Sequence, residues 1–137
     1  MRFTTTVFVA LLVPALLAGC FGDGGGGRGT TYDGTWTVAY TDPADIPTPI
    51  IAGQTVACSN PAVALTLVNG SGSATQTMTC VFSTPSDTQT KVYLISVAIS
   101  DAGVTNAIVN GSPLTGTCIS TVGCSAQSGS KALSITR

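Results

Sequence analysis

Alternation of apolar and polar residues with a period of two is the feature that most constrains the fold of this chain. In the stretch GTWTVAY, the side chains of Trp36, Val38 and Tyr40 share one face, and three smaller residues share the other. The same period recurs within residues 62–68 and 91–100. A period of two is typical of a β-strand that buries one of its faces. The sequence therefore predicts strands.

Residues that favour turns separate these alternating stretches. Asn69-Gly70 lies between two of them, and Asn-Gly in that position is a strong signal for a tight hairpin. Three prolines within residues 41–53 predict a loop, because proline cannot donate to a strand ladder, and STPSDTQT (83–90) is predicted to be a turn. About eight short strands separated by turns predict an all-β fold over residues 32–137, a single small antiparallel β-barrel or sandwich.

The start of the chain is typical of a protein exported from the cytoplasm. One basic residue, Arg2, precedes an apolar run from Val7 to Gly19. That run is shorter than the ~20 residues that span a bilayer as a helix. A basic start followed by a short apolar segment is the pattern of a cleaved signal peptide. We therefore expect residues 1–19 to be absent from the mature protein.

The apolar run ends in Leu17-Ala18-Gly19-Cys20, which resembles the lipobox of bacterial lipoproteins. The resemblance implies that the Cys20 sulfur carries a diacylglyceryl group and that the signal peptide is cut just before this residue. Two or three acyl chains hold a protein firmly on a bilayer, so the membrane is an expected partner. An ordinary signal peptide followed by a chance cysteine is the alternative.

The residues after Cys20 indicate a location and a tether. Phe21 stands where Gram-negative lipoproteins kept at the inner membrane usually have Asp, so the resemblance implies the outer membrane, on its periplasmic or surface face. In a Gram-positive cell the same motif would imply the outer face of the single membrane. Residues 20–31 are rich in glycine, and we expect a flexible tether with a reach of about 17 Å.

The remaining cysteines suit an oxidising compartment. The chain has five cysteines, of which Cys20 is assigned to lipid, leaving Cys58, Cys80, Cys118 and Cys124. Four cysteines allow three pairings, and we favour Cys58–Cys80 and Cys118–Cys124, the nearest pairs in sequence. Zinc ligation is the alternative interpretation, although the chain has neither His nor a C-x-x-C spacing to support it.

The first and last strands carry a second resemblance. Gly34-Thr35-Trp36 near the start and Arg137 at the end are similar to the arrangement in lipocalins, which implies a barrel whose late Arg packs on the Trp ring in a cation–π contact. The alternative is a Trp that simply fills one end of a small β core. In a ligand-binding barrel, an interior cavity would be lined by residues such as Trp36, Leu65, Ile95, Val97 and Ile99.

Composition argues against most enzymatic and nucleic-acid functions. Without His or Glu, a Ser-His-Asp triad or an imidazole metal site cannot form. A net charge of −1 provides no basic patch for nucleic acid. Ser128 and Lys131 match the S-x-x-K pattern, but they fall in a predicted turn. Asp33, Asp42 and Asp45 could offer oxygen ligands to calcium, but Asp is also common in turns.

These observations predict a non-enzymatic, membrane-anchored envelope lipoprotein with a structural or interaction role and no cofactor. The alternative is a small lipocalin-like barrel that binds an apolar ligand. An interior cavity of roughly 300 Å³ or more would favour ligand binding, whereas a packed interior would favour the first function. The sequence leaves open whether the partner is a protein or a small molecule.

Overall fold

The computed structural model describes residues 30–137. The expected signal peptide, Cys20 and nearly all of the expected tether lie outside the described residues. Over residues 30–137 the chain forms strands and one short 3₁₀ turn, with no helix long and apolar enough to cross a membrane. The elements are β1 (Gly34–Thr41), η1 (Pro43–Asp45), β2 (Val56–Ser59), β3 (Val63–Leu67), β4 (Ser71–Ser83), β5 (Ser86–Ile99), β6 (Val104–Val109), β7 (Ser112–Ser120), β8 (Gly123–Ser128) and β9 (Lys131–Thr136).

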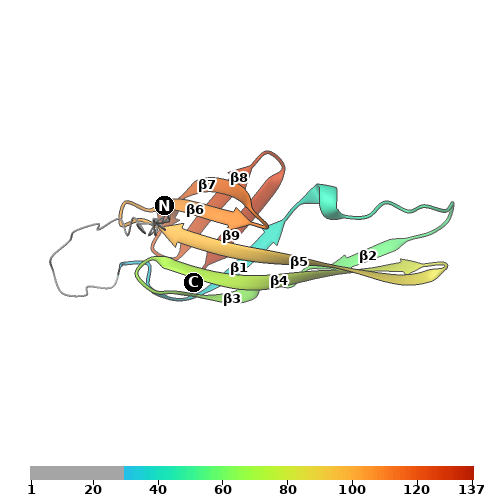
Figure 1. The fold of residues 1–137 in the computed structure, drawn as a ribbon, viewed down its shortest axis with the longest axis horizontal. Helices are drawn as coiled ribbons and strands as arrows, with labels where there is room; N and C mark the ends of the chain where they lie inside the picture. The colour runs from blue at the N-terminus through green and yellow to red at the C-terminus, as the bar shows by residue number, and fades with distance from the viewer. Residues whose placement is uncertain (1–29) are drawn as a thin grey trace, which may run out of the picture.

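The described strands form one antiparallel sheet, which confirms the predicted all-β fold. Their order is β2-β4-β5-β6-β7-β8-β9-β1-β3, so β4 to β9 each pair with their neighbours in sequence. The sheet curls until the first described strand, β1, pairs with the last, β9 (Figure 1). The result is a curled half-barrel rather than two stacked sheets.

A two-residue turn brings β3 back beside β4 and narrows the opening of the half-barrel. Val68 and Ser71 exchange both backbone hydrogen bonds, with N···O distances of 2.9 and 3.1 Å. Between them Asn69 and Gly70 both have positive φ, 52° and 73°, which is the conformation that Asn-Gly favours in tight hairpins. The hairpin predicted from Asn-Gly is confirmed.

One hydrophobic core fills the concave side of the sheet. Alternate residues of each strand point inward, as expected for the pleat of a β-strand. In β1 these are Trp36, Val38 and Tyr40, none more than 3% exposed. The other buried core residues are Tyr32, which precedes β1, and residues of every strand except β2: Leu65, Leu67, Met78, Cys80, Tyr93, Ile95, Val97, Ile99, Ala107, Val109, Leu114, Cys124, Ala126, Leu133 and Ile135.

The segment 83–90 corrects a prediction from the sequence, because most of it is strand rather than turn. Only Thr84 and Pro85 turn the chain, and β4 and β5 pair from Ser83↔Ser86 onward. The segment lacks inward apolar residues because it lies beyond the core and all its side chains are exposed, whereas the buried side chain of this part of the hairpin, Phe82, lies on β4. Backbone hydrogen bonds alone extend β4 and β5 in this segment. The sequence of residues 83–90 therefore has no apolar alternation that would predict a strand.

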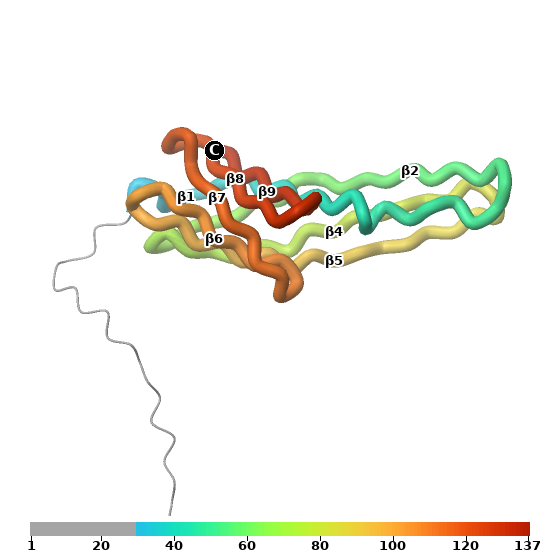
Figure 2. Tube along the Cα trace, turned by 90° about the horizontal axis from the view of Figure 1, so that it is seen from above, coloured from blue at the N-terminus to red at the C-terminus, as the bar shows by residue number. Residues whose placement is uncertain are grey.

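The extended hairpin projects from the half-barrel as an arm. We define the arm as β2 together with residues 78–83 of β4 and 86–92 of β5. Figure 2 shows these strands running past the ends of β6 to β9. Within the described chain, β5 pairs with β6 only from Ile95 to Ile99, so the first half of β5 has β4 as its sole strand neighbour.

Each end of the molecule carries one disulfide, between the pairs favoured from the sequence. Cys58–Cys80 joins directly opposed residues of β2 and β4 in the arm. Cys118–Cys124 joins opposed residues of β7 and β8 at the other end. That second end is where the described chain begins, at residue 30, and we call it the entry end; the opposite end is the arm end.

Candidate functional site

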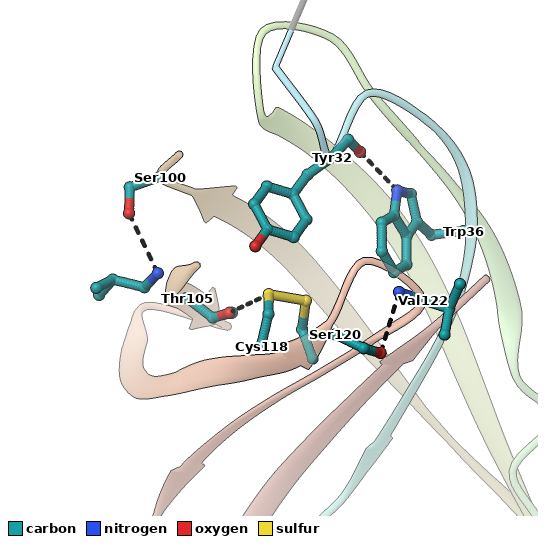
Figure 3. Close-up of a disulfide and its surroundings, with 9 residues drawn as sticks. Tyr32, Trp36, Ser100, Thr105, Cys118, Ser120 and Val122 are labelled. Atoms are coloured by element: carbon teal, nitrogen blue, oxygen red, sulfur yellow. Dashed lines mark hydrogen bonds between the residues drawn. A yellow bond between two sulfur atoms is a disulfide. The ribbon is translucent and has the colours of Figure 1, made fainter. Parts of the chain in front are cut away.

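The entry end is closed by contacts to the single tryptophan. Trp36 is 1% exposed, and its indole Nε1 donates a hydrogen bond of 2.7 Å to the Tyr32 carbonyl, as Figure 3 shows. The Arg137 guanidinium carbon lies 4.7 Å from the centre of the indole ring, within the range of a cation–π contact. The first and last described segments therefore meet over one buried ring.

A carboxylate ties the incoming chain to the β3–β4 hairpin. Asp33 Oδ1 accepts hydrogen bonds from the Gly70 backbone N–H at 2.7 Å and from the Thr30 hydroxyl at 2.8 Å. These bonds lower the pKa of Asp33 from its usual value, because they stabilise the ionised form. Arg137 also donates to the Asp33 carbonyl oxygen. The entry end is thus held by contacts within the domain.

The Cys118–Cys124 disulfide completes the entry end (Figure 3). The fully buried Thr105 hydroxyl lies 3.5 Å from Cys118 Sγ, and the Cys118 backbone N–H donates to the Gly103 carbonyl at 2.8 Å. These polar groups at the entry end are therefore occupied by one another.

The arm end is built differently, around the short turn η1. Asp42 begins the turn by accepting a hydrogen bond of 3.0 Å from the Ala44 backbone N–H, the usual role of Asp before a helical turn. Asp45 then forms an ion pair with Lys91 of β5. The second Asp42 oxygen lies 4.0 Å from the Lys131 ammonium of β9. Opposite charges from three segments thus surround the mouth of the half-barrel.

Two tyrosines lie beneath these charges. The rings of Tyr40 and Tyr93 meet edge to face, with centroids 4.8 Å apart. Burial, with smaller contributions from Asp42 and Asp45, raises the pKa of Tyr40 from 10.0 to about 12. Burial also raises the pKa of Tyr93, and Asp45 adds to the effect. Both phenols are therefore neutral at physiological pH.

A fully buried glutamine organises the floor of the same end. Gln76 Oε1 accepts a hydrogen bond from the Tyr40 backbone N–H at 2.8 Å, and Gln76 Nε2 donates to Asn60 Oδ1 at 2.7 Å. Asn60 in turn donates to the Tyr40 carbonyl at 2.8 Å. These hydrogen bonds take the place of strand pairing beside Tyr40, near the segment between β2 and β3. They satisfy the Tyr40 backbone N–H and C=O, which would otherwise be buried without partners.

Three small pockets surround η1 at the arm end. Their volumes are about 200, 150 and 100 Å³, each below the ~300 Å³ at which small-molecule sites usually begin. Asp42 and Asp45 stand between them, and the largest is lined mainly by apolar atoms, including those of Ile46 and Met78.

The residues expected to line an interior cavity are instead packed together. They are at most 4% exposed and belong to the single core cluster: Trp36, Leu65, Ile95, Val97 and Ile99. Their packing agrees with the small bore of a sheet of about eight strands, which side chains can fill.

The structure separates the acidic residues that the sequence offered for calcium. Asp33 lies at the entry end, and only Asp42 and Asp45 share the arm end, where each faces a lysine. Among residues 30–137 there is no group of three or more metal-ligating side chains. Ser128 ends β8 and Lys131 begins β9, on either side of a turn.

Sequence reasoning did not single out Gln76, Tyr93 or Lys91 for the arm end. The sequence does carry a signal for Gln76. This residue lies two positions before Met78, on the same face of β4, and so it occupies an inward position where apolar side chains are the rule. A polar residue at such a position requires buried partners. The lysine gave no comparable signal, because its partner is 46 residues away in the chain.

Comparisons with protein-family models, with curated proteins and with solved structures find no match for this chain. The class of protein is therefore described by its fold alone, which is a disulfide-linked antiparallel half-barrel with a projecting arm.

Proposed function

We propose that this protein is a lipid-anchored envelope protein that works by binding, not by catalysis, and that it meets its partner with the arm end. The observation that carries the proposal is the position of chain entry. The described domain begins at the end opposite the arm (Figures 1 and 2). An anchor at Cys20 would thus attach to the closed end and leave the arm pointing away from the membrane.

The two disulfides support an extracytoplasmic location. Both pairs lie in directly opposed strand positions, and disulfides of this structural kind persist mainly in oxidising compartments. With Phe21 after the lipidated cysteine, the Gram-negative destination is the outer membrane. The tether of residues 20–31 would place the domain beyond the lipid headgroups.

The chemistry of the arm end supports binding. Its carboxylates face lysines, burial keeps its two tyrosines protonated by raising the pKa of each, and its buried amides are hydrogen-bonded. Such groups can still make hydrogen bonds and ion pairs with a partner. Ile46, Ile50 and Ile51, each more than half exposed in the segment that follows η1, add apolar contact area.

A lipocalin-like ligand carrier is the second candidate. The small apolar pocket beside Ile46 and Met78 favours it, as does the Arg137–Trp36 contact that the resemblance implies. The packed interior favours the interaction role, since an apolar ligand would have to displace core side chains.

Intact-mass measurement of the full chain purified from the envelope tests the anchor. We expect a polypeptide that begins at Cys20 and carries acyl chains. The matched control, Cys20→Ser, keeps the size of the side chain but removes the nucleophilic thiol, so it should lack lipid and leave the membrane fraction. Recovery of a soluble wild-type protein that begins at another residue would contradict the proposal.

A further inference from the structure

The arm has an open strand edge. Within the described residues, the β5 segment 86–92 pairs with β4 on one side, and no strand lies on the other. All its side chains are exposed. Natural proteins protect such an edge with proline, a bulge or charged side chains, because its N–H and C=O groups can pair with another strand. This segment has no proline or bulge, and its two charged residues, Asp87 and Lys91, have opposite signs.

The hydrogen bonds next to the open edge show which backbone groups face outward. Asn110, the residue after β6, donates from its backbone N–H to the Leu94 carbonyl, and its side-chain amide bonds to the Leu94 N–H and the Val92 carbonyl. The orientation of backbone groups alternates along an antiparallel strand. The N–H and C=O groups of Thr88 and Thr90 therefore point the same way, beyond the reach of Asn110.

The sequence of this edge is complementary to itself. Read along the strand it is Asp87-Thr88-Gln89-Thr90-Lys91. If two copies run antiparallel with Gln89 opposite Gln89, then Asp87 of each copy stands opposite Lys91 of the other, and threonines stand opposite threonines. Opposite charges and Thr–Thr pairs are both favourable when directly opposed across strands.

We propose that two copies of this protein associate through the β5 edges of their arms, in an antiparallel register centred on Gln89. In this register, Thr88 of one copy and Thr90 of the other exchange both backbone hydrogen bonds, because these groups face each other. The Thr88 N–H, which donates to Asp87 Oδ1 at 2.9 Å within its own chain, takes the Thr90 carbonyl of the other copy instead and leaves the Asp87 carboxylate for Lys91. Two arm sheets then become one continuous sheet. Lys91, which already faces Asp45 within its own chain, gains the carboxylate of Asp87 of the second copy.

A second copy fits this edge better than an unrelated strand for two reasons. The charges match only in the two-fold register, and a two-fold axis requires the same surface on both partners. Because the register is antiparallel, the two arms point toward each other and the half-barrels lie at the far ends of the pair, without contact between them (Figure 2). Copies anchored to one membrane would lean their arms along it to pair. The pairing depends on the arm alone and does not require the lipid anchor.

Cysteine cross-linking tests both the contact and its register in the full chain. Thr88→Cys and Thr90→Cys, carrying different tags, are produced together and examined on non-reducing gels. Both side chains lie on the face opposite the Cys58–Cys80 disulfide, which limits disulfide exchange. The mixture should give a mixed dimer, because opposed residues in a hydrogen-bonded pair are ~5.5 Å apart between Cα atoms, a distance that a disulfide spans.

Each cysteine variant alone is the matched control. Two copies of Thr88→Cys would place their new thiols on a diagonal, with Cα atoms ~7–8 Å apart, too far to bridge without backbone movement. Strong homodimers of either single variant would mean a different register and would overturn the proposal. So would a mixture without dimers, or cross-links to other envelope proteins only, which would assign the edge to a different partner.

A backbone substitution provides a second, independent measurement. Thr90→Pro removes an N–H that faces the open edge and that β4 does not use, so the monomer should stay folded. Thr90→Val keeps this N–H and is the matched control. In analytical ultracentrifugation of the detergent-solubilised chain, we expect Thr90→Pro to weaken dimerisation about tenfold or more, since two donors are lost per dimer. Equal dimerisation of the two variants would overturn the proposal.

Discussion

The two ends of the half-barrel are made by the same strands, yet they satisfy their polar groups in different ways. At the entry end, Arg137 covers the Trp36 ring and the Asp33 carboxylate accepts from the backbone of a hairpin, so charged side chains meet a ring and backbone groups rather than each other. At the arm end, Asp42 and Asp45 face lysines from distant strands around small pockets. The comparison predicts that stability depends more on the entry end than on the arm end.

The largest expected effect is at the entry end. Trp36→Ala removes a ring that is 1% exposed, and truncation of a buried aromatic residue costs about 3–5 kcal/mol in free energy of unfolding. Urea unfolding followed by circular dichroism measures this loss, since the variant has no tryptophan to report by fluorescence. Trp36→Phe, the control, keeps much of the apolar area and should lose less.

Ordinary surface substitutions change the unfolding free energy by about 0.5 kcal/mol or less. A change that small in Trp36→Ala would contradict the comparison of the entry end with the arm end. It would mean that the entry end contributes little to stability despite its burial.

The second effect, at the arm end, should be smaller. Gln76→Ala leaves the Tyr40 backbone N–H and the Asn60 amide without their partner, and unsatisfied buried groups cost about 1–3 kcal/mol. Urea unfolding followed by Trp36 fluorescence measures the loss. The native emission should stay the same, because the tryptophan lies at the other end. Asn60→Ala, which removes a less buried member of the network, is the control and should cost less.

A shift in native Trp36 emission in the Gln76→Ala variant would show that the two ends are not independent. That outcome would mean that one cooperative network runs through the core and links the arm end to the entry end.

Some of this organisation is predictable from the sequence and some is not, for physical reasons. The alternation of Trp36, Val38 and Tyr40 is sufficient to predict β1, because burying one face of a strand imposes a period of two. Asn69-Gly70 predicts its hairpin because few other residues adopt positive φ readily. These signals are local, so a single sequence carries them.

The arm and the arm end lack such local signals. Residues 83–90 extend a hairpin without apolar alternation, because neither face of that segment meets the core. The contacts of Gln76 with Tyr40 depend on the register between strands distant in sequence, and the two acidic residues beside η1 find lysines on β5 and β9 only after the sheet has curled. Contacts between residues that are distant in sequence therefore form the candidate site, and composition alone does not predict these contacts.

The smallest expected effect depends on pH and belongs to the arm end. Burial raises the pKa of Tyr40 from 10.0 to about 12, so between these values the unfolded chain releases this proton while the folded chain keeps it. The unfolded state then binds fewer protons than the folded state, and stability falls as pH rises through this window. Below pH 10 the contribution is fully present.

Tyr40→Phe has no proton to release and should lose less stability between pH 9 and pH 12. Urea midpoints across this range, with tyrosinate absorbance recorded in parallel, measure the difference, and Tyr32→Phe, which alters a tyrosine at the entry end, is the control. Identical alkaline profiles for wild type and Tyr40→Phe would mean that the arm end opens to solvent before the phenol ionises, and that its tyrosines are less enclosed than the tryptophan at the entry end.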